Sequence, residues 1–462
     1  MRQFDLIVIG SGSGLDVAVA AANRDLRVAI IEKGPLGGTC LNRGCIPSKM
    51  LIHSADLMEE MKGAGKFGIK VKGYEVDYPS IVDRVTSEVD SESKSIENAL
   101  MGSENPILFK GLGKFTGPKL IGVNGDEITA EKILIAAGSR PKIPEIEGLR
   151  ESGFITSDEA LRLREQPKTL AIIGGGYIAA ELAHFFGSLG TEVTIIHRKE
   201  LLLSNEDEEV ARAFTDIASK KYRVFTSSEP VSVRREGSKY EIAVKDLKAS
   251  SIVTVRSDQL LVAAGRVPNS DLLDLEKTGV QVDPRGYVKV NEYLETNVPG
   301  IYALGDIIGK YQFKHAANLE AEYALQNILS PEDKAPVDYT AMPHAIFASP
   351  QIASVGSTEQ ELRSKGIDYV AAKWRYIDSG MGKAIEDHDG FVKFLYEKKT
   401  LKILGCHIIG TDAATLIHEV IVAMRSCQGD AFSIINTVHI HPALPEVVQR
   451  AATNVHFHDH EH

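Results

Sequence analysis

The chain has 462 residues, a formal net charge of −11, 43% hydrophobic and 25% charged residues. This length suggests about three domains of ordinary globular composition. No basic run could follow a phosphate backbone, no apolar stretch is long enough to span a membrane, and the start of the chain lacks the shape of a signal peptide. We therefore expect no nucleic-acid or membrane partner and a cytoplasmic location.

The N-terminal residues predict a strand, a glycine-rich turn, a helix and a second strand. These elements are a strand over 6–9, a helix over 17–22 and a strand over 27–31. Gly10, Gly12 and Gly14 form the turn, and Glu32 ends the second strand. In this context such a turn holds a pyrophosphate at the helix N-terminus, and the acid accepts hydrogen bonds from ribose hydroxyls. Leu15 stands where the pattern usually has its last glycine, so how closely the helix packs on the strand stays open.

Residues 37–49 read Gly-Gly-Thr-Cys-Leu-Asn-Arg-Gly-Cys-Ile-Pro-Ser-Lys and carry Cys40 and Cys45. Thiols separated by four residues can close a small disulfide ring, and strained disulfides are the labile, catalytic kind. A structural disulfide is the weaker alternative, because so short a loop removes little entropy from the unfolded chain. A metal site is disfavoured, because Cys406 and Cys427 have no ligand-like neighbours. We expect Cys406 to be a buried small hydrophobe and Cys427 a structural thiol.

The middle of the chain repeats the N-terminal pattern. We expect short strands over 107–115 and 119–128, and then an apolar strand that runs into Gly138 and Pro141. The repeat consists of a strand over 170–173, a glycine turn with Gly174 and Gly176, a helix to residue 189, a strand over 192–196, and a segment over 260–269 that contains Gly265 and echoes 133–141. Both copies keep their glycines, so two dinucleotides are expected rather than one functional and one vestigial fold.

Two later stretches carry candidate polar groups. Asp306 ends the segment Thr-Asn-Val-Pro-Gly-Ile-Tyr-Ala-Leu-Gly-Asp; taken alone it would be a helix N-cap. His441 precedes a proline, and Pro445 can open a helix with Glu446 in its first turn. The carboxylate could then reach back to the imidazole, fix its tautomer and raise its basicity, as in a general base with an orienting partner. A structural histidine is the alternative, and we keep that interpretation for His439.

Residues 37–49 resemble the redox motif of the flavoprotein disulfide reductases, the pyridine nucleotide-disulfide oxidoreductase family, and the Pro-Ser-Lys ending is most similar to the dihydrolipoamide dehydrogenase branch. Residues 296–306 resemble the second FAD motif of the family, and strands near 343–356 and 403–410 resemble its dimerisation domain. The resemblance implies an α/β protein with two doubly wound, Rossmann-like domains and a C-terminal α+β dimerisation domain. The implied boundaries are 1–140 with 270–328 for FAD, 141–269 for NAD(P), and 336–462 for the interface.

The resemblance also implies roles for individual residues. Cys40 would exchange with substrate, Cys45 would face the flavin, and His441 with Glu446 would be the base, supplied by the other subunit of a homodimer. Lys49 and Glu181 would pair beside the flavin. FAD would contact Gly10, Gly12, Gly14, Glu32, Gly38, Thr39, Lys49, Gly138 and Asp306. The nicotinamide nucleotide would contact Gly174, Gly176, His197, Arg198, Lys199 and Gly265.

The implied reaction is oxidation of dihydrolipoamide by NAD(P)+ through the Cys40–Cys45 disulfide. One alternative is an NADPH-dependent reductase of mycothione or glutathione disulfide, because residues 313–318 and 441–446 are closer to mycothione reductase. Another is a binding role as a docked subunit of a 2-oxoacid dehydrogenase complex.

NADP(H) is expected to be accepted and preferred, since His197 replaces the usual acid and Arg198 and Lys199 can attract a 2′-phosphate. An alternative of about equal weight is that Arg198 and Lys199 are simply solvated side chains of a loop and bind no coenzyme phosphate. The histidine-rich tail, 456–462, is expected to be a solvated end rather than a metal site.

Overall fold

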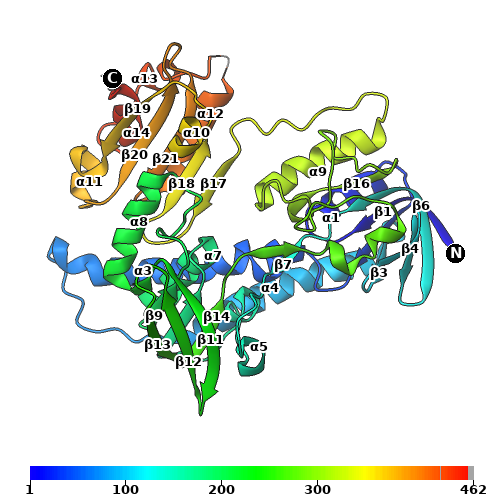
Figure 1. Cartoon of the computed structure of the whole chain (residues 1–462). Helices are drawn as coiled ribbons and strands as arrows, with labels where there is room; N and C mark the ends of the chain where they lie inside the picture. Colours follow the sequence, from blue (N-terminus) through cyan, green and yellow to red (C-terminus); the bar gives the residue numbers. More distant parts are fainter. Residues whose placement is uncertain (427, 456–462) are drawn as a thin grey trace.

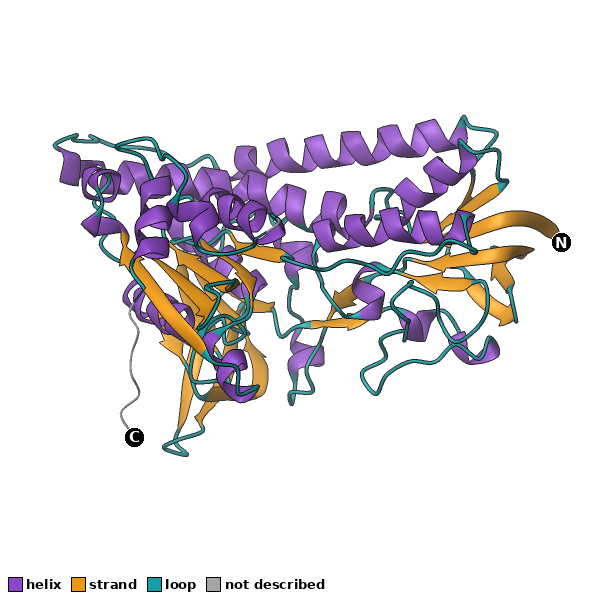
Figure 2. Cartoon of the chain, turned by 90° about the horizontal axis from the view of Figure 1, so that it is seen from above, coloured by secondary structure: helices purple, strands orange, loops and turns teal. Residues whose placement is uncertain are grey.

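The computed structural model describes residues 1–426 and 428–455. Cys427 and the histidine-rich tail lie outside the described residues, so the predictions made for them are not addressed. The described chain is elongated, with the N-terminal sheet at one end and the C-terminal strands at the other (Figures 1 and 2). No helix in the described part of the chain is both long and apolar enough to cross a membrane.

The N-terminal sheet is a doubly wound parallel sheet extended by an antiparallel hairpin. Its strand order is β3-β2-β1-β6-β5-β4, and β16 pairs with β6. The strands are β1 (Arg2–Ile9), β2 (Val28–Glu32), β3 (Ile107–Lys110), β4 (Lys114–Gly117), β5 (Leu120–Val123), β6 (Asp126–Ile135) and β16 (Ile301–Ala303). The strand β16 returns from far along the chain, so residues near 300 complete the same sheet as residues 2–9.

Helix α1 (Gly14–Ala22) packs tightly on this sheet despite Leu15. A Cβ atom on Gly14 would lie 2.8 Å from both Val8 Cγ1 and Ala136 Cβ. The close approach of helix and strand therefore depends on Gly14, the first residue of the helix. The buried face of α1 carries Val17 and Ala18.

The two strands predicted over 107–115 and 119–128 are wrong in their extent. The first is broken after Lys110, and β4 starts a new strand at Lys114. The second is broken at Asn124 and Gly125, which have φ of 50° and 86° and connect β5 to β6. Positive φ at two consecutive residues is the geometry of a tight hairpin turn, and Asn-Gly is its usual sequence.

The second dinucleotide fold has a parallel sheet with the order β10-β9-β8-β14. Its elements are β8 (Thr169–Ile173), α7 (Tyr177–Ser188), β9 (Glu192–Ile196), α8 (Glu208–Lys221), β10 (Arg223–Phe225) and β14 (Gln259–Val262), with an antiparallel sheet of β11 (Ser228–Glu236), β12 (Lys239–Asp246) and β13 (Ile252–Ser257) beside them. The segments that close the two folds, β7 (Ser139–Pro141) and β15 (Arg266–Pro268), pair with each other in antiparallel register. The internal repeat therefore meets itself at the junction of the two folds.

The C-terminal region is α+β. Its antiparallel sheet has the order β17-β18-β21-β20-β19. Its elements are β17 (Pro343–Ile346), β18 (Ile352–Gly356), β19 (Tyr369–Arg375), β20 (Phe391–Glu397), β21 (Ile403–Ile409), α12 (Ala413–Arg425), α13 (Phe432–Ile435) and α14 (Pro445–Thr453). Cys406 is buried in β21, and burial raises the pKa of its thiol.

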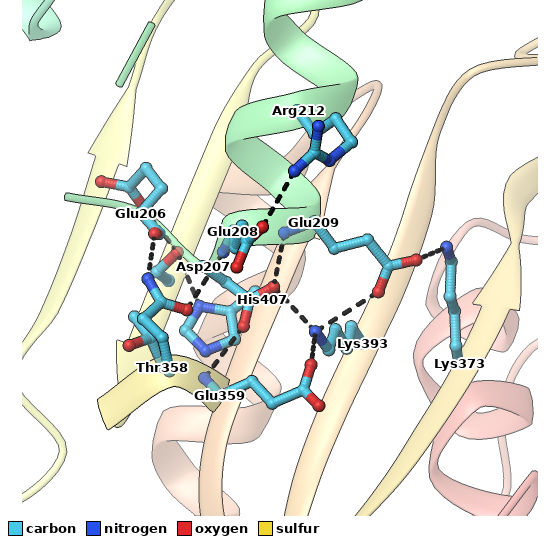
Figure 3. Close-up of polar contacts among 12 residues, drawn as sticks. Glu206, Asp207, Glu208, Glu209, Arg212, Thr358, Glu359, Lys373, Lys393 and His407 are labelled. Atoms are coloured by element: carbon cyan, nitrogen blue, oxygen red, sulfur yellow. Dashed lines mark hydrogen bonds and ion pairs between the residues drawn. The ribbon is translucent and has the colours of Figure 1, made fainter. Parts of the chain in front are cut away.

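A buried ionic cluster joins the second fold to the C-terminal sheet (Figure 3). The Lys393 side chain is 3% exposed; its ammonium donates to Asp207 at 2.8 Å and to Glu359 at 2.6 Å. Asp207 is the N-cap of α8, and Lys393 lies on β20. The cluster fixes the start of α8 against the C-terminal sheet.

Candidate active site

The redox segment forms two consecutive helices, α2 (Gly38–Arg43) and α3 (Cys45–Gly63). Cys40 lies in α2, and Cys45 is the first residue of α3. Gly44 separates the helices, and a Cβ atom there would lie 2.8 Å from Thr39 O. The buried Asn42 side chain donates to Leu36 O at 2.8 Å and to Gly38 O at 2.9 Å. The segment is thus held by its own backbone contacts and by one buried amide.

Cys40 and Cys45 are not bonded to each other in this structure. The pKa values of the two thiols shift in opposite directions. A hydrogen bond from Cys40, opposed by burial and helped by the charge of Lys49, lowers the pKa of Cys45 to about 7. The same hydrogen bond and burial raise the pKa of Cys40. Cys45 is therefore the thiolate of the pair, and Cys40 is the thiol that donates to it.

Lys49 and Glu181 form an ion pair one helical turn from Cys45. Lys49 Nζ donates to the two carboxylate oxygens of Glu181 at 2.8 and 2.7 Å. The backbone N–H of Phe347 donates to Glu181 Oε1 at 3.0 Å, and Lys49 Nζ lies 4.6 Å from the centre of the Phe347 ring. Because α3, α7 and the loop after β17 contribute one residue each, this contact holds all three parts of the fold around the thiols.

A cleft of about 1520 Å³ runs from the thiols along the N-terminal sheet. Eight of the nine predicted FAD contacts line it: Gly10, Gly12, Glu32, Gly38, Thr39, Lys49, Gly138 and Asp306. The ninth, Gly14, is used in packing, as described above. At Gly10 φ is 105°, and a Cβ atom would lie 2.3 Å from Ala136 O, whereas a Cβ atom on Gly12 would meet nothing within 4 Å. The backbone turn is thus open toward the cleft, which fits a bound dinucleotide phosphate.

The acidic groups of the cleft are held in place. Glu32 Oε2 accepts from the N–H and the hydroxyl of Ser11 at 2.9 and 2.8 Å. Asp306 Oδ2 accepts from Ser139 Oγ at 2.5 Å, and Arg266 Nε donates to the same hydroxyl at 2.7 Å. Both carboxylates keep lone pairs for ribose or ribityl hydroxyls, so the residues fit FAD.

The second glycine turn has the same backbone requirement as the first. At Gly174 φ is 131°, and a Cβ atom there would lie 2.1 Å from Ala263 O; Gly265 also has positive φ, at 111°. A Cβ atom on Gly176 would meet nothing within 4 Å. None of the predicted nicotinamide contacts lines the main cleft. They mark a separate surface at the end of the second sheet.

The three residues after β9 have different surroundings. The His197 ring lies against Gly175, where a Cβ atom would be 2.5 Å from its Cγ, and burial lowers the pKa of the imidazole. Arg198 and Lys199 are exposed. Arg198 Nε lies 3.8 Å from Glu229 Oε2 of β11. The end of β9 therefore offers two exposed cations, one of them beside a carboxylate.

His441 and Glu446 form the expected pair. His441 Nδ1 lies 3.0 and 3.1 Å from the carboxylate oxygens of Glu446, and Pro445 opens α14 as predicted. The Glu446 side chain is 8% exposed and that of His441 is 71% exposed. The hydrogen bond from His441 lowers the pKa of Glu446. Neither residue lines the cleft that holds Cys40 and Cys45.

Sequence reasoning missed a second carboxylate–histidine pair, whose histidine, His344, lines the cleft. The fully buried Glu206 accepts from His344 Nε2 at 2.8 Å and from Ser354 Oγ at 3.0 Å. The His344 ring is parallel to that of Phe313, with centroids 5.5 Å apart. No local signal announces this pair, because its members are 138 residues apart. Among the described residues, no group of three or more metal-ligating side chains is found.

Comparison with known proteins agrees with this site. Residues 4–321 match the family described as pyridine nucleotide-disulphide oxidoreductase, and residues 342–452 match its dimerisation domain. The chain is 38% identical to mycothione reductase of Mycobacterium tuberculosis over 98% of this chain and 99% of that protein. It is 37% identical to dihydrolipoyl dehydrogenase of Chlamydia pneumoniae, over 96% and 95% of the two chains. The Cu(II) complex of the HOCl-induced flavoprotein disulfide reductase RclA from Escherichia coli superposes with a TM-score of 0.87 at 26% identity, covering 98% of this chain and 99% of that one.

Proposed function

Because the chain belongs to the pyridine nucleotide-disulphide oxidoreductase family, we propose that Cys40 and Cys45 exchange electrons between a small thiol substrate and a pyridine nucleotide. The protein is a flavoprotein disulfide oxidoreductase of a family that uses FAD and NAD(P)H, and its dimerisation domain supports a homodimer. In our proposal, residues 1–140 and 270–328 bind FAD and residues 141–269 bind the nicotinamide nucleotide. Residues 336–462 form the interface.

The placement of the two thiols carries this proposal: both line the cleft, and the Lys49–Glu181 ion pair lies one helical turn from Cys45. In the oxidised pair, a substrate thiolate attacks the sulfur of Cys40, the Cys40–Cys45 bond breaks, and Cys45 leaves as the thiolate. The second substrate thiol then displaces Cys40 as a thiol and leaves as the disulfide, so two electrons remain on the cysteine pair. Bound FAD supplies the two-electron carrier between Cys45 and the nicotinamide. Lys49 supplies positive charge beside the Cys45 thiolate, and Glu181 holds Lys49 in place.

His441 is our proposed base for the substrate thiol, acting on the cleft of the partner subunit. The imidazole is exposed, is held at Nδ1 by Glu446 and leaves Nε2 for a substrate proton. Its neighbours Val438 and Ile440 are apolar and 96% and 79% exposed. Such side chains are expected to be covered in the homodimer, which would bring His441 to a second copy of the chain.

Dihydrolipoamide is our first candidate substrate, given the redox motif and the dihydrolipoyl dehydrogenase relatives. Reduction of a low-molecular-weight disulfide of the mycothione type is the second, favoured by the 38% identity to mycothione reductase. Steady-state kcat/KM with dihydrolipoamide, glutathione disulfide and mycothione, each with both coenzymes, separates them. We expect turnover of dihydrolipoamide with NAD(P)+ and none in Cys45→Ser. Preferential reduction of mycothione would select the second candidate, and wild-type rates equal to those of Cys45→Ser would refute both.

Dihydrolipoamide as substrate would also make a 2-oxoacid dehydrogenase complex the expected partner. The homodimer should then bind the acyltransferase of such a complex in a pull-down with purified components. Fast dihydrolipoamide turnover without this binding would remove the complex from the proposal and leave the enzyme activity intact.

NADP(H) is our proposed preferred coenzyme, because the end of β9 has two exposed cations and no acid at residue 197. A charged hydrogen bond from Arg198 to a 2′-phosphate is worth about 1.5–3 kcal/mol, so Arg198→Ala should lower kcat/KM for NADPH roughly tenfold or more. The value for NADH should hardly change. Lys248→Ala, which removes an exposed lysine paired with Glu200, is the matched control. A wild-type preference for NADH that Arg198→Ala leaves unchanged would contradict the assignment.

A further inference from the structure

The segment that presents His441 has one inward-facing side chain. Residues 436–444 connect α13 to α14, and within 436–442 every residue except His439 is exposed. The side chain of His439 is only 5% exposed. This histidine therefore anchors the middle of the segment from within, while Gln449 Nε2 of α14 donates to Thr437 O at 3.1 Å from outside.

His439 is held at both ring nitrogens. Its Nε2 lies 2.5 Å from Glu419 Oε1, and its Nδ1 lies 2.9 Å from Thr437 O. Glu419 belongs to α12, which packs on the C-terminal sheet through buried Leu416 and Val420. The contact thus joins the loop to a helix that is itself fixed.

The chemistry of these partners excludes His439 as a second base. A backbone carbonyl only accepts, so Nδ1 must carry a hydrogen, and a proton must also lie between Nε2 and the Glu419 carboxylate. Neither nitrogen has a free lone pair while these contacts hold. His439 differs in this from His441, where only Nδ1 has a hydrogen-bond partner among the residues that the structure describes.

We propose that His439 and Glu419 are a positioning pair that fixes the place of the proposed base His441, two residues along the chain. The inference rests on the role proposed for His441. A general base acts only within hydrogen-bond reach of the proton it removes, and misplacement by about 1 Å can cost up to 10²-fold in rate. Glu446 fixes the orientation of the imidazole, and His439 fixes the loop on which it stands.

The test is a double-mutant cycle. In each variant, rapid mixing of oxidised enzyme with dihydrolipoamide measures the rate of the dithiol half-reaction. We expect His439→Ala to slow this step about 10- to 100-fold and to leave hydride exchange between nicotinamides unchanged. In a His441→Ala background the same substitution should have no further effect, because it acts only through His441. His439→Gln, which keeps a donor for Glu419, should recover part of the rate. Asn436→Ala, an exposed change in the same loop, is the matched control.

The outcomes separate this inference from the role of His441. If His441→Ala leaves the dithiol step unchanged, the proposed base falls and the positioning pair with it. If His441→Ala slows the step but His439→Ala does not, or if the two effects add in the double mutant, only the positioning pair is overturned. Flavin content and sedimentation confirm that each variant is a loaded dimer. Should His439→Ala fail that check, Glu419→Gln takes its place in the cycle, with a smaller slowing expected.

Discussion

The two redox thiols differ because of what surrounds them. Cys45 has a hydrogen bond from Cys40 and the charge of Lys49, and its pKa is about 7, whereas that of Cys40 is raised. A thiolate forms above its pKa, so alkylation of reduced enzyme at Cys45 should increase as the pH passes about 7. The pair titrates as a unit, and this midpoint belongs to both thiols.

Replacing Lys49 tests this explanation. Without the cation the thiolate loses a stabilising charge, so Lys49→Met should move the alkylation midpoint to higher pH. The measurement is the rate of iodoacetamide labelling at Cys45 as a function of pH, read by peptide mass. Lys66→Met, an exposed change beyond the far end of α3, should leave the midpoint in place. An equal midpoint in wild type and Lys49→Met would show that the charge does not set the acidity.

Among the elements, those with local signals were predictable. The strand–glycine–helix units of both folds follow from hydrophobic runs and glycine turns, and α14 follows from Pro445. The β5–β6 turn also has a local signal, Asn124-Gly125, which divides the strand predicted over 119–128. Contacts between residues far apart in the sequence could not be predicted from local patterns. These are the Phe347 contact to Glu181, the Glu206–His344 pair and the Lys393 cluster. Tertiary packing alone decides such contacts.

The Lys393 cluster gives a prediction at the scale of elements. Lys393→Met leaves the fully buried Asp207 without its ammonium partner, and such a loss costs about 3–5 kcal/mol. Lys373→Met removes a 38%-exposed partner of Glu209 and should cost less than about 1 kcal/mol. The measurement is the midpoint of urea unfolding, monitored by the fluorescence of Trp374. This is the one tryptophan of the chain and lies on β19 in this sheet. Equal midpoints for the two variants would contradict the role of the cluster.

The same cluster should weaken in acid. Burial opposes ionisation of Glu359, yet hydrogen bonds from Lys393 and its other partners lower its pKa from 4.5 to about 2. A carboxylate whose pKa is lowered on folding stabilises the fold fully above its unfolded pKa. This contribution is therefore present above about pH 4.5 and is lost as the pH falls toward 2. Lys393→Met should reduce that loss in the same unfolding experiment.

At the scale of the whole molecule, one subunit does not complete the proposed active site. The His441–Glu446 pair was predictable because its members are five residues apart and a proline opens the helix between them. Its position relative to the thiols was not, since it depends on the assembly. His441 is exposed and absent from the cleft of its own chain, while Cys40 and Cys45 line that cleft. The thiols and the base are thus expected to meet only across the homodimer.

Subunit complementation tests this claim most directly. Cys45→Ser and His441→Ala homodimers are each expected to be nearly inactive with a dithiol substrate. The two homodimers are mixed, dissociated and reassociated at random, so that about half of the new dimers are hybrids. In each hybrid, one of the two sites has both an intact cysteine pair and an intact base. About one quarter of the wild-type activity should therefore return. If His441 instead served the cysteines of its own chain, no hybrid would hold a complete site. Recovery of about that fraction is the predicted result, and no recovery from hybrids shown to have formed would contradict the account.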